Sequence, residues 1–310
     1  MEFRHIPVMP TECINALNIK DDGIYFDGTL GGAGHSRLIL ESSKKGFLFA
    51  TDLDTQAIEA ASKKLEDFKG RFALVHDNFK NFSAVADELG IAEIDGALLD
   101  LGVSSYQLDE RERGFSYMAE DTRLDMRMDR SQPFSAYEIV NGYDEKKLEY
   151  ILETFGEERF ARQIARNIVA ERQKAPVETT GELVKIIEKS IPAKFKHDGH
   201  PAKRTFQAIR IEVNGELSGL DTAIRDIVGR LKRGGRIAVI TFHSLEDRIV
   251  KRTFVDLATG CTCDKSLPIC VCGRKSIVKL VTKKPITASE EELSVNKRSQ
   301  SAKLRVAEKL

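Results

Sequence analysis

Carboxylates and glycines are closely spaced near the amino terminus, in a pattern typical of a site for a nucleotide-like cofactor. Residues 27–35 read Asp-Gly-Thr-Leu-Gly-Gly-Ala-Gly-His, and a second acidic group, Asp52, follows the next apolar run. The glycines let the backbone turn sharply and approach a ligand closely. A carboxylate at the second position can accept hydrogen bonds from both hydroxyls of a ribose. The sequence therefore predicts half of a cofactor site here.

The elements that must position these groups alternate along the first hundred residues. Short apolar runs predict buried strands, and the segments between them have helical patterns. The expected strands lie near 24–26, 46–51, 72–76 and 94–99, and the expected helices near 35–43, 55–66 and 81–89. This alternation indicates a parallel sheet covered by helices, in which Asp27, Asp52 and Asp100 meet at the carboxyl edge of the strands.

Dinucleotides and S-adenosylmethionine are both bound by turns of this kind, so the glycines alone do not choose between them. The glycines within 28–34 do not fit the Gly-x-Gly-x-x-Gly pattern, and the Asp27 carboxylate would serve a pyrophosphate poorly. Residues 76–79 place polar and aromatic groups where an adenine could be bound. These details favour S-adenosylmethionine. The alternative is a tight structural turn with solvated acids at the strand ends.

The pattern changes after Gln107. Residues 109–135 show no sustained period and are interpreted as a long functional loop, and helical signals then dominate as far as Asn214. From residue 216 the α/β character returns, with a helix over 216–232, a Gly234-Gly235 turn, a strand over 236–242 and an antiparallel edge pair near 279–281 and 304–307. We expect three segments: 1–108 and 215–310 form one α/β domain, and 109–214 form a loop and an inserted helical, substrate-binding domain.

Composition bounds the class of protein but not its partner. The chain has 310 residues, of which 41% are hydrophobic, so it can bury a substantial core. The sequence shows neither the apolar run of a signal peptide nor a segment long enough to span a bilayer, so we expect a soluble cytoplasmic protein without a membrane partner. Lys plus Arg and Asp plus Glu both total 48, so evidence for a nucleic-acid partner must be local.

Local basic character is found in the inserted segment. Arg159, Arg162 and Arg166 recur at helical spacing, while apolar residues starting at Phe160 fall on another face. Such a stripe can follow the phosphates of RNA. The alternative is an ordinary solvated face of an amphipathic helix.

Four of the five cysteines are close together near the carboxyl terminus: Cys261, Cys263, Cys270 and Cys272. Four thiols can form a tetrahedral zinc site, although both pairs are Cys-x-Cys rather than Cys-x-x-Cys. Reduced loop cysteines are the alternative, and a disulfide is disfavoured in a reducing compartment. We assign no metal ligand on this evidence.

Several long motifs, in order, resemble those of the bacterial 16S ribosomal RNA cytosine-N4 methyltransferase family, also called MraW. The resemblance runs nearly end to end. The motifs are Asp27–His35, Asp95–Ser105, Leu124–Asp129, Gly156–Arg162, Arg204–Asn214 and Thr241–Arg248.

The resemblance implies the α/β fold of a class I S-adenosylmethionine-dependent (Rossmann-like) methyltransferase with an inserted helical domain. It further implies methylation of the exocyclic N4 of a cytidine in the decoding region of 16S ribosomal RNA, in the small ribosomal subunit, and no DNA substrate. Matching the family's cofactor contacts residue by residue gives Ala33, Gly34, His35, Asp52, Phe79, Asp100 and Gln107. Ala33 stands where the family frequently has glycine.

Methyl transfer to an exocyclic amine is an in-line displacement, so the protein must chiefly align the reacting atoms. We interpret His243 and Asp125 as the candidates that position the target base; a histidine that caps the following helix is the alternative for His243. Two other functions stay open: a methyltransferase that acts on another RNA or on protein, and an RNA-binding ribosome assembly factor that retains the cofactor fold.

Overall fold

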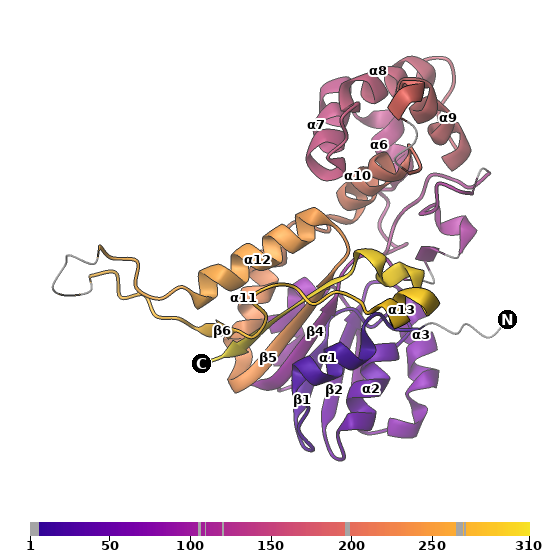
Figure 1. Cartoon of the computed structure of the whole chain (residues 1–310). Helices are drawn as coiled ribbons and strands as arrows, with labels where there is room; N and C mark the ends of the chain where they lie inside the picture. The colour runs from indigo at the N-terminus through magenta and orange to yellow at the C-terminus, as the bar shows by residue number, and fades with distance from the viewer. Residues whose placement is uncertain are drawn as a thin grey trace. The chain divides into compact units, whose positions relative to one another are not determined.

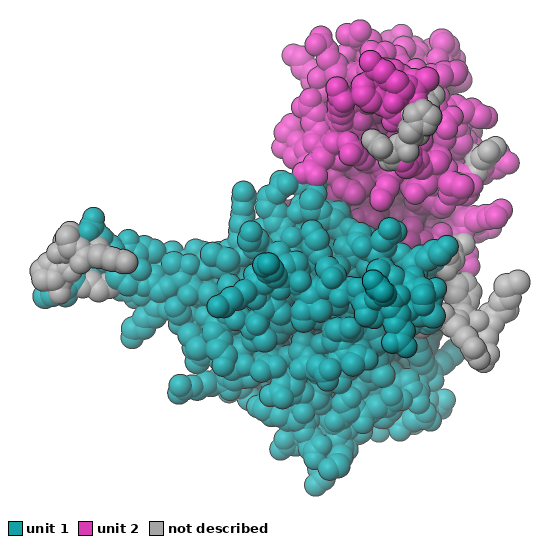
Figure 2. All heavy atoms as spheres, viewed as in Figure 1, with its two compact units in different colours: residues 1–102, 219–310 teal, residues 103–218 magenta. Residues whose placement is uncertain are grey.

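The chain divides into two compact units, each described here by itself (Figure 2). The computed structural model describes residues 6–104, 107–108, 110–119, 121–195, 199–264, 269 and 271–310. The sheet unit comprises residues 1–102 and 219–310, and the helical unit comprises residues 103–218.

The boundaries of the helical unit lie outside those expected from the sequence, which were 108/109 and 214/215. Val103 and Leu108 pack against the hydrophobic core of the helical unit, so the preceding segment belongs to it. At the other end Glu216 accepts a hydrogen bond from Arg210 at 2.9 Å. Packing and an ion pair therefore extend the unit beyond the ends of its helical signals.

The sheet unit is built on a seven-stranded sheet in the order β3-β2-β1-β4-β5-β7-β6 (Figure 1). The first five strands of this order are parallel, and β7 is antiparallel to both of its neighbours, which confirms the predicted edge pair. The strands are β1 (Ile24–Asp27), β2 (Phe47–Asp52), β3 (Phe72–His76), β4 (Ile94–Asp100), β5 (Leu231–Thr241), β6 (Val278–Leu280) and β7 (Lys303–Lys309).

Helices cover both faces of this sheet because its strands are apolar on both sides. Neighbouring residues of β1 enter different cores: Phe26 packs with Phe49 and Phe82 on one face, and Tyr25 packs on the other. Helices α4, α11 and α12 contribute to the first core, and α1, α2 and α3 to the second. The helices of this unit are α1 (Pro10–Leu17), α2 (Gly34–Ser42), α3 (Thr55–Lys64), α4 (Phe82–Glu88), α11 (Leu220–Arg230), α12 (Ser244–Ala258) and α13 (Glu290–Val295).

One element prediction in this unit was wrong. The sequence predicted a helix to residue 232, a Gly234-Gly235 turn and a strand from Arg236, but α11 ends at Arg230 and β5 begins at Leu231. The pairing of β4 with β5 shifts register between Ile94 and Gly96, so the glycines lie at an irregularity within the strand. A β-bulge and a turn use the same residue type, which is why the pattern misled.

The helical unit has its own core, formed by side chains such as Leu148, Ile164 and Ile209. The segment 109–135 has only one short helical turn, Arg111–Arg113, among its described residues, as its lack of period predicted. It is nevertheless well anchored, since Phe115, Leu124 and Met126 are buried in this core. The helices are α6 (Ala136–Gly142), α7 (Glu145–Gly156), α8 (Ala161–Arg172), α9 (Thr180–Ser190) and α10 (Lys203–Asn214).

No helix among the described residues combines the length and the apolarity needed to cross a membrane.

Candidate cofactor site and nucleic-acid surface

The strand order of the sheet unit reverses between β1 and β4. From this point β2 and β3 extend to one side, and β5, β7 and β6 to the other. Asp27 ends β1 and Asp100 ends β4, and the two strands are in parallel register with Asp27 opposite Leu98. In open α/β sheets, ligands bind outside the carboxyl ends of the strands at this switch point. The residues predicted from the sequence therefore lie at the expected place.

The turn after β1 requires glycine at its first position. A Cβ atom on Gly28 would lie 2.4 Å from Leu99 Cδ2 and 2.8 Å from Phe79 Cβ. Both distances are shorter than any normal carbon contact, so the backbone runs directly against the core and against the predicted cofactor residue Phe79. Glycine is therefore needed for this turn to pack against the sheet.

Asp52, at the end of β2, holds the far part of the same turn. Its Oδ2 accepts a hydrogen bond from the Gly31 N–H at 2.7 Å, and its Oδ1 accepts one from the Asp54 N–H at 2.9 Å. Burial raises the pKa of the Asp52 carboxyl to about 6, although both backbone bonds favour the charged form. A carboxylate has about four lone-pair positions, so these bonds leave capacity for the hydroxyls of a ribose.

Asp27 has a structural role that sequence reasoning missed. Its carboxylate is buried and accepts hydrogen bonds from Ser36 Oγ at 2.6 Å and from the Thr29 N–H at 3.1 Å. It thus ties the glycine turn to the first turn of α2. Burial raises the pKa of Asp27, although the hydrogen bonds that it accepts favour the charged form and lower the pKa.

Asp100 presents the least satisfied polar group at this edge. Its Oδ1 is buried and has no hydrogen-bond partner among the described residues, and its Oδ2 lies 3.7 Å from His35 Nε2. Burial raises the pKa of Asp100 to about 8, and the negative charges of Asp27 and Glu246 add to this shift. Buried polar atoms in native proteins nearly always have partners, so the orphaned oxygen indicates a ligand group at this position.

The start of α2 explains the family's glycine preference at residue 33. Ala33 is the residue before this helix and has φ of 54°, in the left-handed region that favours glycine. Gly34 and His35 form the first turn of the helix, and the His35 side chain is buried. Ala33, Gly34, His35, Asp52 and Asp100 are thus gathered at one edge of the sheet unit.

Gln107 and Asp125 belong to the helical unit. Gln107 is buried, and its Oε1 accepts a hydrogen bond from the Ser104 N–H at 3.0 Å. Both carboxylate oxygens of Asp125 accept hydrogen bonds from the Arg127 guanidinium at 2.8 Å. Burial would raise the pKa of Asp125, but the hydrogen bonds from Arg127 hold it below its ordinary value. Asp125 therefore organises its own segment, and its contact with a target base stays a prediction.

His243 lies at the carboxyl end of β5, where it caps α12. Its Nδ1 faces the Glu246 N–H at 3.5 Å, and its Nε2 lies 3.1 Å from Glu246 Oε1. Glu246 Oε2 in turn accepts hydrogen bonds from the N–H groups of Phe242 and His243 at 2.9 and 3.3 Å. The structure thus shows the alternative arrangement for His243, in which the histidine caps the following helix. Sequence reasoning missed the role of the buried Glu246. The His-x-x-Glu spacing could have indicated it, because a glutamate three residues after the cap is typical of a capping box.

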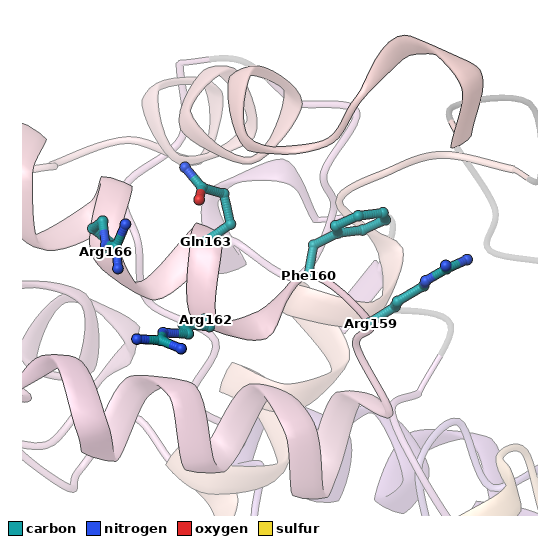
Figure 3. Close-up of a pocket in the computed structure, with 5 residues that line it drawn as sticks. All are labelled: Arg159, Phe160, Arg162, Gln163 and Arg166. Carbon is teal, nitrogen blue, oxygen red and sulfur yellow. The ribbon is translucent and has the colours of Figure 1, made fainter.

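Of the three arginines predicted as one basic stripe, Arg162 and Arg166 lie on α8, whereas Arg159 precedes this helix, which begins at Ala161. A pocket of about 430 Å³ lies beside them (Figure 3). Arg162 and Arg166 extend from the helix itself, whereas Phe160 and Arg159 lie at its amino-terminal end. The Arg159 guanidinium lies 4.6 Å from the ring centroid of Phe195. The pocket is lined by Arg159, Phe160, Arg162, Gln163 and Arg166.

Few acids neutralise these arginines. Arg166 Nε lies 3.9 Å from Glu145 Oε1 in an exposed pair, and within the described part of the chain Arg159 and Arg162 form no ion pair. All three arginine side chains are exposed. An exposed, under-compensated group of guanidinium ions suits phosphate groups, since arginine donates to them in a bidentate way.

Comparison with known proteins places this chain in a family. The MraW methylase family pattern matches residues 2–310. The chain belongs to the MraW methylase family. It is 58% identical to the ribosomal RNA small subunit methyltransferase H of Clostridium botulinum (strain Loch Maree / Type A3) and 54% identical to that of Clostridioides difficile (strain 630), over 100% of each chain in both comparisons.

Solved structures with a similar fold include an rRNA methylase from Streptococcus thermophilus and an S-adenosylmethionine-dependent O-methyltransferase from Thermotoga maritima. The first has a TM-score of 0.42 and 13% identity and covers 99% of both chains. The second has a TM-score of 0.41 and 9% identity, and covers 100% of this chain and 69% of the other.

The MraW family member described here has the class I methyltransferase fold, whose methyl donor is S-adenosylmethionine. The residues at the sheet edge fit this group. Asp52 keeps acceptor capacity for a ribose, and Asp100 Oδ1 is buried without a hydrogen-bond partner among the described residues. The excess of carboxylates suits a cofactor that carries positive charge on its sulfonium and amino groups.

Proposed function

We propose that this chain transfers a methyl group from S-adenosylmethionine to the exocyclic N4 of a cytidine in the decoding region of 16S ribosomal RNA, in the small ribosomal subunit in the cytoplasm. The structural observation that carries the proposal is the buried, unpartnered oxygen of Asp100 beside the glycine turn at the switch point. Full-length identity of 54–58% to proteins named ribosomal RNA small subunit methyltransferase H supports the choice of substrate.

Each proposed cofactor residue contacts the part of S-adenosylmethionine that suits its chemistry. Asp52 accepts hydrogen bonds from the ribose hydroxyls, and Phe79 offers an aromatic face to the adenine. Ala33, Gly34 and His35 supply the start of α2, and Asp100 supplies a carboxylate for the charged end of the donor. The family resemblance also assigns Gln107 a cofactor contact.

S-adenosylmethionine supplies an electrophilic methyl group, and the chain's own residues must orient the amine that attacks it. The lone pair of the cytosine N4 is delocalised into the ring, so an acceptor that holds one N4 hydrogen favours attack. As the new carbon–nitrogen bond forms, the methyl–sulfur bond would break and a neutral thioether would leave; N4 then carries a positive charge and must lose one proton to that acceptor or to water. No covalent intermediate on the protein is needed.

His243 and Asp125 remain the proposed base-positioning residues, and the structure limits how each could act. His243 Nδ1 faces the Glu246 N–H, whereas Nε2 lies 3.1 Å from Glu246 Oε1 but has no hydrogen-bond partner among the described residues, so Nε2 is the ring atom left for a contact with a cytosine. Both oxygens of Asp125 bind Arg127 but retain further lone pairs. Either residue can therefore contact a base without losing its structural partner completely.

Arg159, Arg162 and Arg166 are the proposed contact with the RNA backbone. Their exposure and their scarcity of acidic partners fit a sequence-independent phosphate contact. Such contacts position the substrate, and recognition of the cytidine itself then falls to the residues near the sheet edge.

Mass spectrometry of ribosomal RNA nucleosides, with and without this protein, tests the proposal. Small subunits from cells that lack the protein are incubated with purified chain and S-adenosylmethionine, and we expect one new N4-methylcytidine per subunit. The Asp52→Ala variant serves as a control with weakened donor binding. Donor binding without methylation of any subunit preparation would favour the assembly factor, and methylation found only in other RNA or protein would favour the other methyltransferase class.

A further inference from the structure

Three cysteine sulfurs meet in the segment that joins α12 to β6. The Sγ atoms of Cys261, Cys263 and Cys272 all lie within 4.8 Å of one another, and those of Cys261 and Cys272 are 3.7 Å apart. Two of these residues come from the outgoing arm of the segment and one from the returning arm. Cys270 lies outside the described residues.

The sulfur separations match those of a metal site. Zinc binds thiolate sulfur at about 2.3 Å in a tetrahedron, which places two sulfur ligands about 3.8 Å apart. A disulfide would require about 2.05 Å. A single pair at 3.7 Å could also be a weak thiol hydrogen bond, but a third sulfur within the same sphere is what a shared ion requires.

No hydrophobic core holds these sulfurs together. Between Leu257 and Val278, none of the described residues is buried. Hydrogen bonds join the two arms near the base of the segment: Ser276 Oγ donates to the Ala258 carbonyl at 2.8 Å, the Ile277 N–H donates to the Leu257 carbonyl at 2.9 Å, and Arg274 Nε donates to the Thr259 carbonyl at 3.1 Å. Figure 1 shows the two arms extending away from the sheet beyond this base. A long segment without buried side chains needs another source of order.

We propose that Cys261, Cys263 and Cys272 bind one zinc ion that fixes the outer part of this segment. Each ligating thiol releases its proton to solvent when it binds the ion, so affinity rises with pH. Thiolates are soft ligands that select zinc over magnesium or calcium. The site lies in a different segment from the cofactor residues, and it goes beyond the proposed methyl transfer.

Zinc content of the full-length protein, purified with a reductant and without chelator, tests this site. Plasma mass spectrometry should find about one zinc per chain, and the Cys261→Ser/Cys272→Ser variant should retain less than a tenth of that amount. Cys13→Ala is the matched control, because Cys13 is buried in the core of the sheet unit and should leave zinc content unchanged. Equal zinc in the wild type and the double variant would overturn the proposal.

Cobalt provides a second readout that does not depend on how the protein was purified. Chain refilled with Co²⁺ should show thiolate-to-metal charge-transfer absorption, and the double variant should not. Absence of these bands in the wild type would contradict thiolate ligation. Intact mass two daltons below the reduced value, with two fewer titratable thiols, would also overturn the site, since it would show a disulfide.

Discussion

The acidic edge of the sheet unit and the basic surface of the helical unit use charge in opposite ways. At the sheet edge Asp27 is buried and Asp100 has a buried oxygen, and burial raises the pKa of both. Arg159, which precedes α8, and Arg162, which lies on it, are exposed to solvent. Salt screens exposed charges strongly and buried ones weakly, whereas protonation matters most where burial has moved a pKa toward neutrality. We therefore expect donor binding to follow pH and RNA binding to follow salt.

Removing the arginines should give the largest effect. The Arg159→Ala/Arg162→Ala/Arg166→Ala variant should bind small subunits about a hundredfold more weakly at low salt, because each exposed contact contributes on the order of 1 kcal/mol. The slope of log affinity against log salt should become shallower by about 2, as expected for three phosphate contacts on a single strand. Filter binding at several salt concentrations measures both.

A charge-matched control separates this surface from general attraction. Lys146, Lys185 and Lys189 are exposed on α7 and α9 of the same unit, and their triple alanine variant removes the same charge. It should change affinity by less than threefold. Equal losses in the two variants, or an unchanged salt slope in the arginine variant, would exclude a specific arginine contact.

Asp52→Ala, at the acidic edge of the sheet unit, should give the next largest effect, on donor binding. Loss of an ionised acceptor costs about 2 kcal/mol, so the Kd for S-adenosylmethionine should rise about thirtyfold. Calorimetry measures this value, and Glu93→Ala, an exposed acid on the segment before β4, is the control. A change within twofold would remove the assigned ribose contact.

Proton linkage should be smaller but more diagnostic. A cationic donor favours ionised Asp100, whose pKa is raised to about 8, so binding should release protons and affinity should rise with pH up to about 8. Calorimetric heats at pH 7 should differ between buffers of low and high ionisation enthalpy. Asp100→Asn should reduce this difference; identical heats for the wild type in both buffers would show that donor binding releases no proton.

The same group makes a prediction about stability without ligand. The pKa of Asp100 is raised from its ordinary value of 3.8 to about 8. Between these two pH values the folded chain therefore keeps a proton on Asp100 that the unfolded chain has lost. Stability from this group is present at low pH and is lost as pH rises through about 8. Asp100→Asn should therefore raise the Tm at pH 8 while it weakens donor binding.

The smallest expected effect concerns His243. Asparagine caps helices well, so His243→Asn should keep the Tm while removing the imidazole, and His243→Ala should cost about 1 kcal/mol of stability. A fall in kcat for His243→Asn at unchanged Tm would support base positioning. Unchanged turnover would reduce His243 to a helix cap.

The sequence predicted the strands and the glycine turn of this edge well because their signals are local. A strand, a glycine turn and an acid at the next strand end are set by backbone geometry and spacing, and β1, β2, β3 and β4 lie where they were expected. The backbone conformation of Ala33 also has a local origin, since its positive φ follows from the turn.

What the sequence could not supply depends on distant partners. The segment 109–135 lacks a period, yet the Leu124 N–H donates to the Glu178 carbonyl at 2.9 Å and its side chain is buried. The Arg127 pairing that occupies Asp125 is near in sequence, but only the folded chain fixes its bidentate geometry. Likewise, Cys272 meets Cys261 only because the base of their segment is closed.

The order of strands has a consequence for how the chain folds. β4 ends at Asp100 and β5 begins at Leu231, yet the two pair side by side, with the helical unit between them in sequence. Closing an unfolded loop of that length costs conformational entropy, whereas a folded insert shortens it. Helical units form local contacts and fold fast. The insert should therefore fold first, so that a core substitution such as Ile164→Ala would delay the pairing of β4 with β5.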